Sequence, residues 1–154
     1  MSKFYYLDSS ALVKRYVEEP GSQGVRALVV KDGWFFISKV AYAEILMTLR
    51  RKSAEGTLTD DEFSKCLDAL DKDWQAFYIV EFSDEVIKTL TEQVLEYLRV
   101  LDAIHLASAL WLREALAPDM VFVCSDRKLK GKVRQHSFVS LDPTEYHELE
   151  SPSC

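Results

Sequence analysis

Short runs of apolar residues alternate along the chain with longer segments in which apolar residues recur three or four positions apart. Each short run is four or five residues long and rich in aromatic and β-branched side chains, as in strands buried within a sheet. The runs are Phe4–Leu7, Trp34–Ile37, Tyr78–Phe82, Val121–Cys124 and Phe138–Leu141. The longer segments have the period of a helix with one buried face. The pattern therefore predicts strands that alternate with helices.

Helix start and stop signals divide the longer segments. Thr59 and Glu62 have the spacing of a capping box, in which each side chain bonds the backbone of the other residue. The predicted helices start after Ser9 or Ser10, near Val25, and at Ser38, Thr59, Ser83, Leu101 and Asp126, and four of them run to about Lys52, Leu98, Leu116 and Arg134. Gly131 lies inside the last of these segments, and we expect it to interrupt that helix.

The alternation predicts an α/β fold, a single three-layer α/β/α domain with a mostly parallel central sheet. We assign residues 1–142 to this domain and expect residues 143–154, which show little pattern, to form a frayed tail. The chain has 154 residues, 48% of them hydrophobic, which suits one domain with a substantial core. Ligands of such sheets bind beyond the carboxyl ends of the strands, so candidate chemistry is sought directly after each strand.

Composition argues against several other classes of protein. No apolar run approaches the roughly 18 residues of a membrane span, and Asp8 ends the first run before a signal peptide can form. We therefore expect a cytoplasmic protein without membrane contact. The three cysteines, Cys66, Cys124 and Cys154, lack CxxC spacing, which argues against a disulfide framework and a structural zinc site. We expect Cys66 and Cys124 to be buried thiols rather than nucleophiles.

The net charge of −6 is unevenly distributed along the chain. Residues 55–100 contain 12 acidic and 4 basic residues, whereas the rest of the chain contains 13 acidic and 15 basic residues. Outside one acidic segment the protein is thus slightly basic. Net charge alone therefore does not exclude a nucleic-acid partner.

Four carboxylates stand at positions that a parallel sheet can bring together. Asp8 directly follows the first strand, and Asp126 follows the fourth. Glu44 lies in the helix after the second strand, and Asp102 lies at the start of the helix that begins at Leu101. Asp8 and Asp126 are also in position to cap the helices that follow them, which is the simpler interpretation of either residue taken alone.

The surroundings of Glu44 and Asp102 favour a functional interpretation. Each is a lone acid in an apolar stretch, Val40–Met47 for Glu44 and Val100–Ala107 for Asp102. A buried carboxylate costs free energy unless it is paired or bound to a cation, and several in one pocket repel one another unless a divalent ion lies between them. Oxygen ligands without cysteine favour Mg²⁺ or Mn²⁺ over Zn²⁺. Sites of this kind activate water for the hydrolysis of phosphate esters.

Four segments carry a family resemblance: Tyr6–Tyr16, the stretch around Glu44, Leu101–Ala107 and Ser125–Leu129. Together they resemble the PIN-domain family, and within it the VapC-type toxins of toxin–antitoxin pairs. The likeness extends from Phe4 to Asp142, with all four acidic positions present in order. The resemblance implies an endoribonuclease that depends on Mg²⁺, with Mn²⁺ as a substitute. It also implies a homodimer that acts on RNA and is silenced by a cognate antitoxin.

The resemblance also assigns roles to individual residues. The acidic residues that hold the metal and catalyse the reaction are matched by Asp8, Glu44, Asp102 and Asp126. Ser125 matches a small hydroxyl residue that orients the last acid. The implied reaction is attack of a metal-activated water on an RNA phosphodiester bond, without a covalent intermediate.

Basic residues cluster beside the last acid. Five of them fall within eight residues: Arg127, Lys128, Lys130, Lys132 and Arg134. Such a run is usually a solvated helix face. Its position next to Asp126 makes Arg127, Lys128 and Lys130 candidates for binding RNA phosphates.

Two further features have alternative interpretations. His105 lies three residues after Asp102 on the same helical face, and is either a hydrogen-bonded core histidine or a metal ligand or general base. The helix after Thr59 has an apolar stripe that either belongs to the core, or forms a groove for a partner helix, or forms a dimer face. The stripe consists of Phe63, Leu67, Leu70, Trp74 and Phe77.

Two rival functions fit the residues less well. A phosphatase with Asp8 as its nucleophile normally has a second acid two residues later, where this chain has Ser10. A non-catalytic module of the same fold that binds RNA or protein has no need of four acids. Thermal stability with and without Mn²⁺ separates the second rival from the nuclease.

Overall fold

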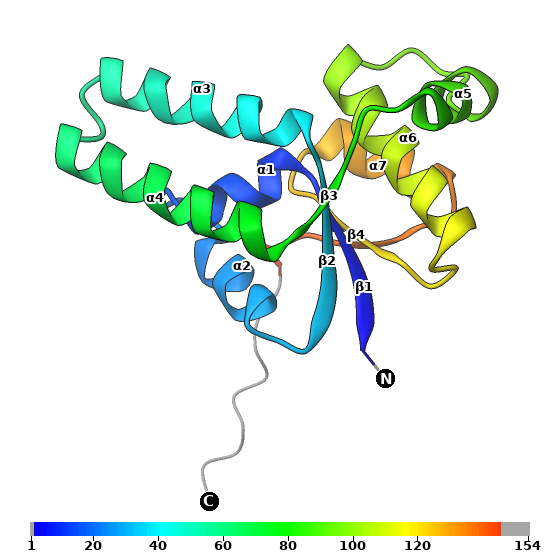
Figure 1. Cartoon of the computed structure of the whole chain (residues 1–154), viewed down its shortest axis with the longest axis horizontal. Helices are drawn as coiled ribbons and strands as arrows, with labels where there is room; N and C mark the ends of the chain where they lie inside the picture. Colours follow the sequence, from blue (N-terminus) through cyan, green and yellow to red (C-terminus); the bar gives the residue numbers. More distant parts are fainter. Residues whose placement is uncertain (1, 146–154) are drawn as a thin grey trace, which may run out of the picture.

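The central sheet of the computed structural model, which describes residues 2–145, has five parallel strands (Figure 1). The strands are β1 (Lys3–Leu7), β2 (Gly33–Ser38), β3 (Tyr78–Val80), β4 (Val121–Val123) and β5 (Val139–Leu141). Their order across the sheet is β3-β2-β1-β4-β5, and all four pairings are parallel. The expected sheet is therefore confirmed. The prediction of a frayed tail falls mainly on residues 146–154, which lie outside the described residues.

Helices cover both faces of this sheet. They are α1 (Ser9–Leu12), the 3₁₀ helix η1 (Val13–Arg15), α2 (Ser22–Val29), α3 (Val40–Ala54), α4 (Asp60–Ala76), α5 (Asp84–Gln93), α6 (Val100–Ala115) and α7 (Arg127–Gln135). Figure 1 shows α1 to α4 on one side of the sheet and α5 to α7 on the other, with α3 and α4 packed as a pair. The predicted three-layer α/β/α arrangement is therefore confirmed.

Alternation along the strands divides the core into two clusters. In β1, Tyr5 and Leu7 face the cluster formed with α1 to α4, whereas Tyr6 faces the cluster formed with α5 to α7. In β2, Phe35 faces the first cluster and Phe36 faces the second. Because successive side chains of a strand point to opposite faces, a strand buried on both sides is apolar throughout. This is why the sequence shows continuous apolar runs.

Several helix ends differ from the sequence expectation. Asp8, not Ser9 or Ser10, caps α1, and the cap position of α3 is Lys39, because Ser38 is still the last residue of β2. The helix predicted to reach Leu98 ends at Gln93. Val94 leaves the helical region with ψ of 84°, and both Val94 and Leu98 pack against the core. The end of α5 is thus set by tertiary packing, because no glycine or proline follows Gln93 in this loop.

The expectation that Gly131 interrupts the last helix is wrong. α7 runs unbroken from Arg127 to Gln135. A glycine inside a helix costs about 1 kcal/mol, but the neighbouring apolar residues Leu129 and Val133 are fully buried in the core. Their burial outweighs the glycine and holds α7 in one orientation.

The apolar stripe of α4 belongs to the core. Leu70 is fully buried, and the other four stripe residues pack against the cluster between the sheet and α1 to α4. The capping box at Thr59 and Glu62 is present. Of the interpretations of the stripe, core packing is therefore the one that the structure supports. Among residues 2–145, no helix is long and apolar enough to cross a bilayer.

Candidate carboxylate site

Two of the candidate acids lie at the carboxyl ends of adjacent strands. β1 and β4 pair with Leu7 opposite Val123, and the Asp8 amide donates to the Val123 carbonyl at 3.1 Å. Asp126 lies three residues beyond Val123. Each of these acids also caps a helix: Asp8 Oδ1 accepts from the Ala11 amide at 3.0 Å, and Asp126 Oδ1 accepts from the Leu129 amide at 2.9 Å. The capping interpretation is therefore correct, and it fixes where both carboxylates lie.

All four candidate acids line one cavity of about 210 Å³. Asp8 comes from the end of β1, Glu44 from α3, Asp102 from the first turn of α6, and Asp126 from the start of α7. The rest of the wall consists of Ser9, Ser10, Val13, Ile45 and Thr48. The structure thus brings together acids that are separated by as many as 118 residues in the sequence.

Glu44 is held by two hydrogen bonds. Its Oε1 lies 2.6 Å from Nε2 of His105, and its Oε2 accepts from the Ser9 hydroxyl at 2.9 Å. His105 is 1% exposed, and its Nδ1 lies 2.9 Å from the Tyr6 hydroxyl. The two ring nitrogens thus hold the imidazole between the Glu44 carboxylate and the Tyr6 hydroxyl. The structure therefore shows His105 as a hydrogen-bonded core histidine that contacts one candidate acid.

Two serines connect the strand ends. The Ser10 hydroxyl donates to Oδ1 of Asp8 at 2.8 Å and accepts from the Ser125 amide at 3.2 Å. The Ser125 hydroxyl makes no hydrogen bond to Asp126. Among the described residues it is the one buried side-chain oxygen without a partner. An unpaired buried hydroxyl is costly, and its position beside the acids suits a bound group that supplies the missing contact.

Burial disfavours the charged form of two of the acids. Burial raises the pKa of Asp8 to about 6, although nearby His105 and the Ser10 hydrogen bond act in the opposite direction. The pKa of Asp102 is raised too, first by burial and then by the neighbouring charge of Asp126. Carboxylates crowded in this way are stabilised as anions by a cation between them.

The donor set suits a hard divalent cation, although the side chains do not form a closed cage. All the acidic donors are carboxylate oxygens, and no cysteine or histidine lines the cavity, which favours Mg²⁺ or Mn²⁺. Among the residues that the structure describes, no three His, Cys, Asp or Glu side chains converge closely enough to ligate one ion. Mg²⁺ commonly binds through one or two carboxylates and retains waters, so an open arrangement fits its chemistry.

Sequence reasoning missed the parts played by three residues. The sequence predicts that Ser9 or Ser10 caps a helix, but in the structure these two serines bind Glu44 and Asp8. Tyr6 was assigned to a strand alone, whereas its hydroxyl reaches His105. The available signal was a pair of hydroxyl residues directly after a strand-end acid. The Tyr6 contact had no such signal, because it joins residues 99 positions apart.

The basic residues of α7 divide into two groups. Arg127 and Lys128 are exposed at the start of the helix, next to Asp126. Lys130 instead forms an ion pair with Asp142, with 2.7 Å between Nζ and Oδ2 and only 13% of its side chain exposed. The Asp142 carboxylate competes for this ammonium, so Lys130 is less available to a phosphate than Arg127 and Lys128 are.

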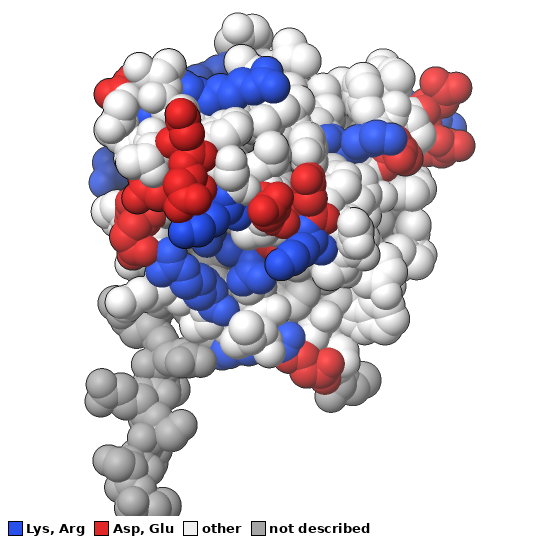
Figure 2. Space-filling model, turned by 60° about the vertical axis from the view of Figure 1, so that its left-hand side comes forward, with Lys and Arg blue, Asp and Glu red and all other residues white. Residues whose placement is uncertain are grey.

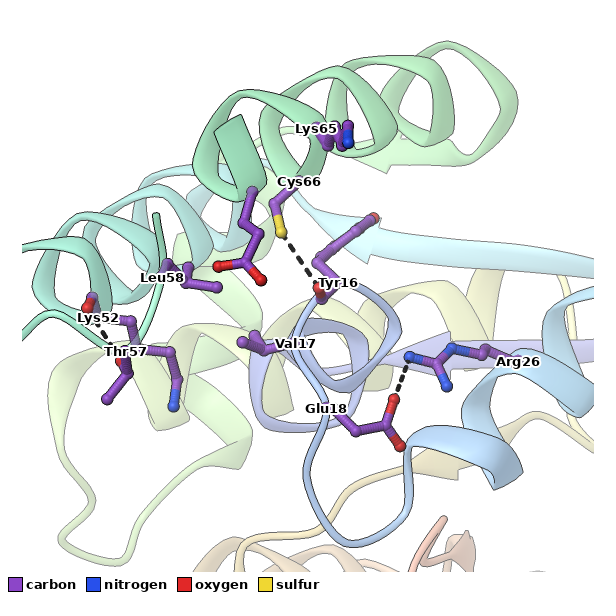
Figure 3. Close-up of a pocket in the computed structure, with 10 residues that line it drawn as sticks. Tyr16, Val17, Glu18, Arg26, Lys52, Thr57, Leu58, Lys65 and Cys66 are labelled. Carbon is purple, nitrogen blue, oxygen red and sulfur yellow. Dashed lines mark hydrogen bonds and ion pairs between the residues drawn. The ribbon is translucent and has the colours of Figure 1, made fainter. Parts of the chain in front are cut away.

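A separate cavity of about 420 Å³ lies between α2, α4 and the turn that joins α3 to α4 (Figure 3). Glu18 and Arg26 form an ion pair in its wall at 2.7 Å. Burial and the nearby Glu62 raise the pKa of Cys66, so this thiol is a poor nucleophile at neutral pH. Figure 2 shows acidic and basic side chains intermingled on this side of the molecule. None of the four candidate acids lines this cavity.

The fold and the acidic cavity together define the class of protein. Residues 5–130 match the family model of the PIN domain, so the chain belongs to the PIN-domain family. A comparison with curated proteins finds no significant match.

Solved structures of similar fold include a toxin–antitoxin complex. The chain is similar to FitAcB from Neisseria gonorrhoeae, with a TM-score of 0.64, 12% identity and coverage of 93% of this chain and 100% of that one. It is similar to a toxin–antitoxin complex from Klebsiella pneumoniae, with a TM-score of 0.62, 17% identity and coverage of 92% and 99%. It is also similar to VapBC2 from Rickettsia felis bound to a promoter DNA fragment, with a TM-score of 0.59, 16% identity and coverage of 90% and 98%. At these identities the likeness shows a shared fold.

Proposed function

We propose that this PIN-domain protein is a metal-dependent endoribonuclease that hydrolyses RNA phosphodiester bonds, and that it is the toxin of a toxin–antitoxin pair. One observation carries the proposal: carboxylates from four separate segments line a single cavity beyond the ends of β1 and β4. Members of the PIN-domain family are in general nucleases. Helix capping accounts for Asp8 and Asp126 but gives no reason for Glu44 and Asp102 to line the same cavity.

The residues that would hold Mg²⁺, or Mn²⁺ in its place, are Asp8, Glu44, Asp102 and Asp126. When bound, the cation lowers the pKa of a coordinated water and stabilises charge on the phosphate. Asp8 is fixed for this role by Ala11 and Ser10. Without a cation, the four carboxylates repel the phosphate that is to be cleaved, so the cation also admits that phosphate to the cavity.

His105 and Ser9 position Glu44 in this proposal. They bind one oxygen each, so the carboxylate faces the cavity in a single orientation. A carboxylate that is oriented before the substrate arrives avoids reorganisation during the reaction. The exposed Arg127 and Lys128 flank Asp126, where they would bind phosphates on either side of the cleaved bond.

We propose further that the protein forms a homodimer in the cytoplasm and is inhibited by an antitoxin protein. The support for an antitoxin is the similarity to chains from toxin–antitoxin complexes across more than nine-tenths of their length. Size-exclusion chromatography with light scattering tests the dimer. Co-expression of the neighbouring open reading frame, followed by co-purification, tests the antitoxin.

One observation favours a second candidate, a non-catalytic module that binds RNA or protein. As noted, no three of the described acidic or metal-binding side chains converge on one point. A module of this kind would keep the fold without a functional metal site. Metal binding separates the two candidates, because only the nuclease requires it.

The experiment is calorimetric titration of Mn²⁺ into the purified protein and three variants. Asp8→Asn and Asp102→Asn each remove one carboxylate charge from the cavity, and we expect affinity to fall about tenfold or more in each. Asp68→Asn is the matched control, since this exposed acid on α4 does not line the cavity. Failure of the wild-type protein to bind Mn²⁺, or equal affinity in all four proteins, would reject the nuclease in favour of the binding module.

A further inference from the structure

A cavity of about 460 Å³ adjoins the carboxylate site and is lined by Tyr97, Leu98, Arg99, Asp102, Lys128 and Lys132. Asp102 lines both this cavity and the carboxylate site, so the two adjoin at this residue. The loop between α5 and α6 provides one wall, and α7 provides the other. The residues of the two walls are about thirty positions apart in the sequence, and no sequence pattern predicts that they line one cavity.

Tyr97 is the least covered aromatic residue near the site. It is 93% exposed, and among the described residues its hydroxyl has no hydrogen-bond partner. A large aromatic side chain standing in solvent is unfavourable for a lone domain and is common where a flat ligand stacks. The bases of single-stranded nucleic acid are such ligands, and stacking on an aromatic ring tolerates any base.

The charges of the cavity favour an anionic ligand. Three of its six lining residues are cations and one is an acid. Neither Lys128 nor Lys132 forms an ion pair within residues 2–145, in contrast to Lys130 on the same helix, although the charge of Lys132 acts on the neighbouring Glu96 carboxylate. If a second copy of this chain docked here about a twofold axis, these cations would face their counterparts in the other copy and repel them. Charge complementarity therefore favours RNA over self-association.

We propose that this cavity is a nucleotide subsite, in which a base of single-stranded RNA stacks on Tyr97 while the adjoining phosphates contact Lys128 and Lys132. The inference rests on the proposed function, because it places the strand next to the bond that the carboxylates cleave. The stacked nucleotide lies next to the cleaved phosphate, since Asp102 is a wall common to the two cavities. Single-stranded RNA is required, because a base within a duplex has no free face to stack.

The test is fluorescence anisotropy with a labelled 12-nucleotide single-stranded RNA of mixed sequence, measured in EDTA so that no metal-dependent cleavage occurs. We expect Tyr97→Ala to weaken binding about tenfold and Tyr97→Phe to bind like the wild type, because the ring and not the hydroxyl stacks. Leu95→Ala is the matched control, since it lies in the same loop and is 82% exposed without lining the cavity. We expect it to leave affinity unchanged.

The cations are tested by salt dependence. Lys128→Ala combined with Lys132→Ala should flatten the slope of log affinity against log salt by roughly one to two, because fewer counterions are released. Lys88→Ala on α5 is the control, since this exposed lysine does not line the cavity. An unchanged slope would overturn the assignment of phosphates to these lysines.

The outcomes separate the subsite from the proposed activity. RNA binding that depends on Tyr97, in a protein that never cleaves RNA, supports the subsite and rejects the nuclease. Cleavage by a wild-type protein whose affinity and KM are unchanged in Tyr97→Ala supports the nuclease and overturns the subsite. Wild-type protein that does not bind the RNA also overturns the subsite. A Tyr97→Ala variant that loses RNA affinity only because its oligomeric state changes would also overturn the subsite. That result would show that the loop between α5 and α6 belongs to a protein interface.

Discussion

Glu44 and His105 lie 61 residues apart in the sequence and meet at 2.6 Å between Oε1 and Nε2. Because His105 is buried and also bonded to Tyr6, it cannot turn away from the carboxylate without breaking a second contact. This arrangement resembles the outer contacts that fix metal-binding side chains in general. The histidine therefore contacts Glu44 and does not itself line the carboxylate cavity.

We predict that His105→Ala lowers the free energy of unfolding by about 2–3 kcal/mol, since it leaves a cavity and removes a buried hydrogen bond of the Tyr6 hydroxyl. Mn²⁺ affinity should fall about tenfold or more, because Glu44 loses its orientation. Tyr6→Phe is the comparison, since it removes only the bond to the far side of the ring. Denaturant unfolding and calorimetric titration provide the two readouts. Unchanged Mn²⁺ affinity in His105→Ala would contradict the positioning role.

Asp8 should reduce stability in the absence of metal. Its pKa is raised by burial to about 6 from 3.8, so the folded protein retains a proton that the unfolded chain has already lost between these values. The free energy of unfolding in EDTA should therefore fall as pH rises from about 4 to 6, by about 3 kcal/mol.

Asp8→Asn removes this titration while keeping a residue that caps helices well. We predict that the variant melts at a higher temperature than the wild type at pH 7 in EDTA. In excess Mn²⁺ the wild type should gain more stability, so that it melts at the same or a higher temperature than the variant. Thermal unfolding in both conditions is the measurement. A variant less stable than the wild type in EDTA would show that burial does not penalise the Asp8 charge.

How far the sequence could predict this site depends on how local the responsible contacts are. Asp8 follows its apolar strand directly and Asp126 follows within three residues, so a parallel sheet brings them to one edge in any register that buries those strands. The continuous apolar runs predicted that sheet, and the capping box at Thr59 located the start of α4.

The contacts that escaped prediction are between side chains of distant elements. Lys130 looked like part of a solvated basic run, because Asp142, 12 residues later, gave no sign of pairing with it. The end of α5 at Gln93 is set by how Val94 and Leu98 pack on the core. No local residue preference marks such an end, so only the packed structure reveals it.

Lys128 and Lys130 lie close together on α7, but only Lys130 forms a buried ion pair among the described residues. Lys130→Ala leaves Asp142, whose side chain is 7% exposed, without its ammonium partner. Burial alone raises the pKa of Asp142, but the hydrogen bonds from Lys130 and Thr144 outweigh it and hold the pKa low. We predict a loss of about 2–4 kcal/mol in the free energy of unfolding with unchanged RNA affinity. Lys128 is exposed, so Lys128→Ala should lower RNA affinity and leave the free energy of unfolding unchanged. Reduced RNA affinity in a folded Lys130→Ala protein would contradict the different roles of the two lysines.

Asp73 on α4 binds two residues at the end of η1 and does not line the carboxylate cavity. It accepts from Nη2 of Arg15 at 3.0 Å and from the Tyr16 hydroxyl at 2.7 Å, and is 8% exposed. Asp73→Ala leaves the guanidinium and the hydroxyl unpaired, and we predict a loss of about 3 kcal/mol of stability. Mn²⁺ affinity should not change. Asp71→Ala removes one exposed hydrogen bond from Tyr42 and should lower the free energy of unfolding by less than about 1 kcal/mol. Equal losses in the two variants would contradict a stabilising role of the buried Asp73 contacts.

The most direct measurement is cleavage of a mixed RNA pool by purified protein in Mg²⁺, in Mn²⁺ and in EDTA. The wild type, Asp8→Asn and the control Asp68→Asn are compared after circular dichroism has confirmed that each is folded. We predict cutting by the wild type and by Asp68→Asn in either metal, no cutting in EDTA, and a loss of at least about 100-fold in Asp8→Asn. Cutting that persists in EDTA or in Asp8→Asn, or no cutting by the wild type in either metal, would contradict a metal-dependent ribonuclease built on these four carboxylates.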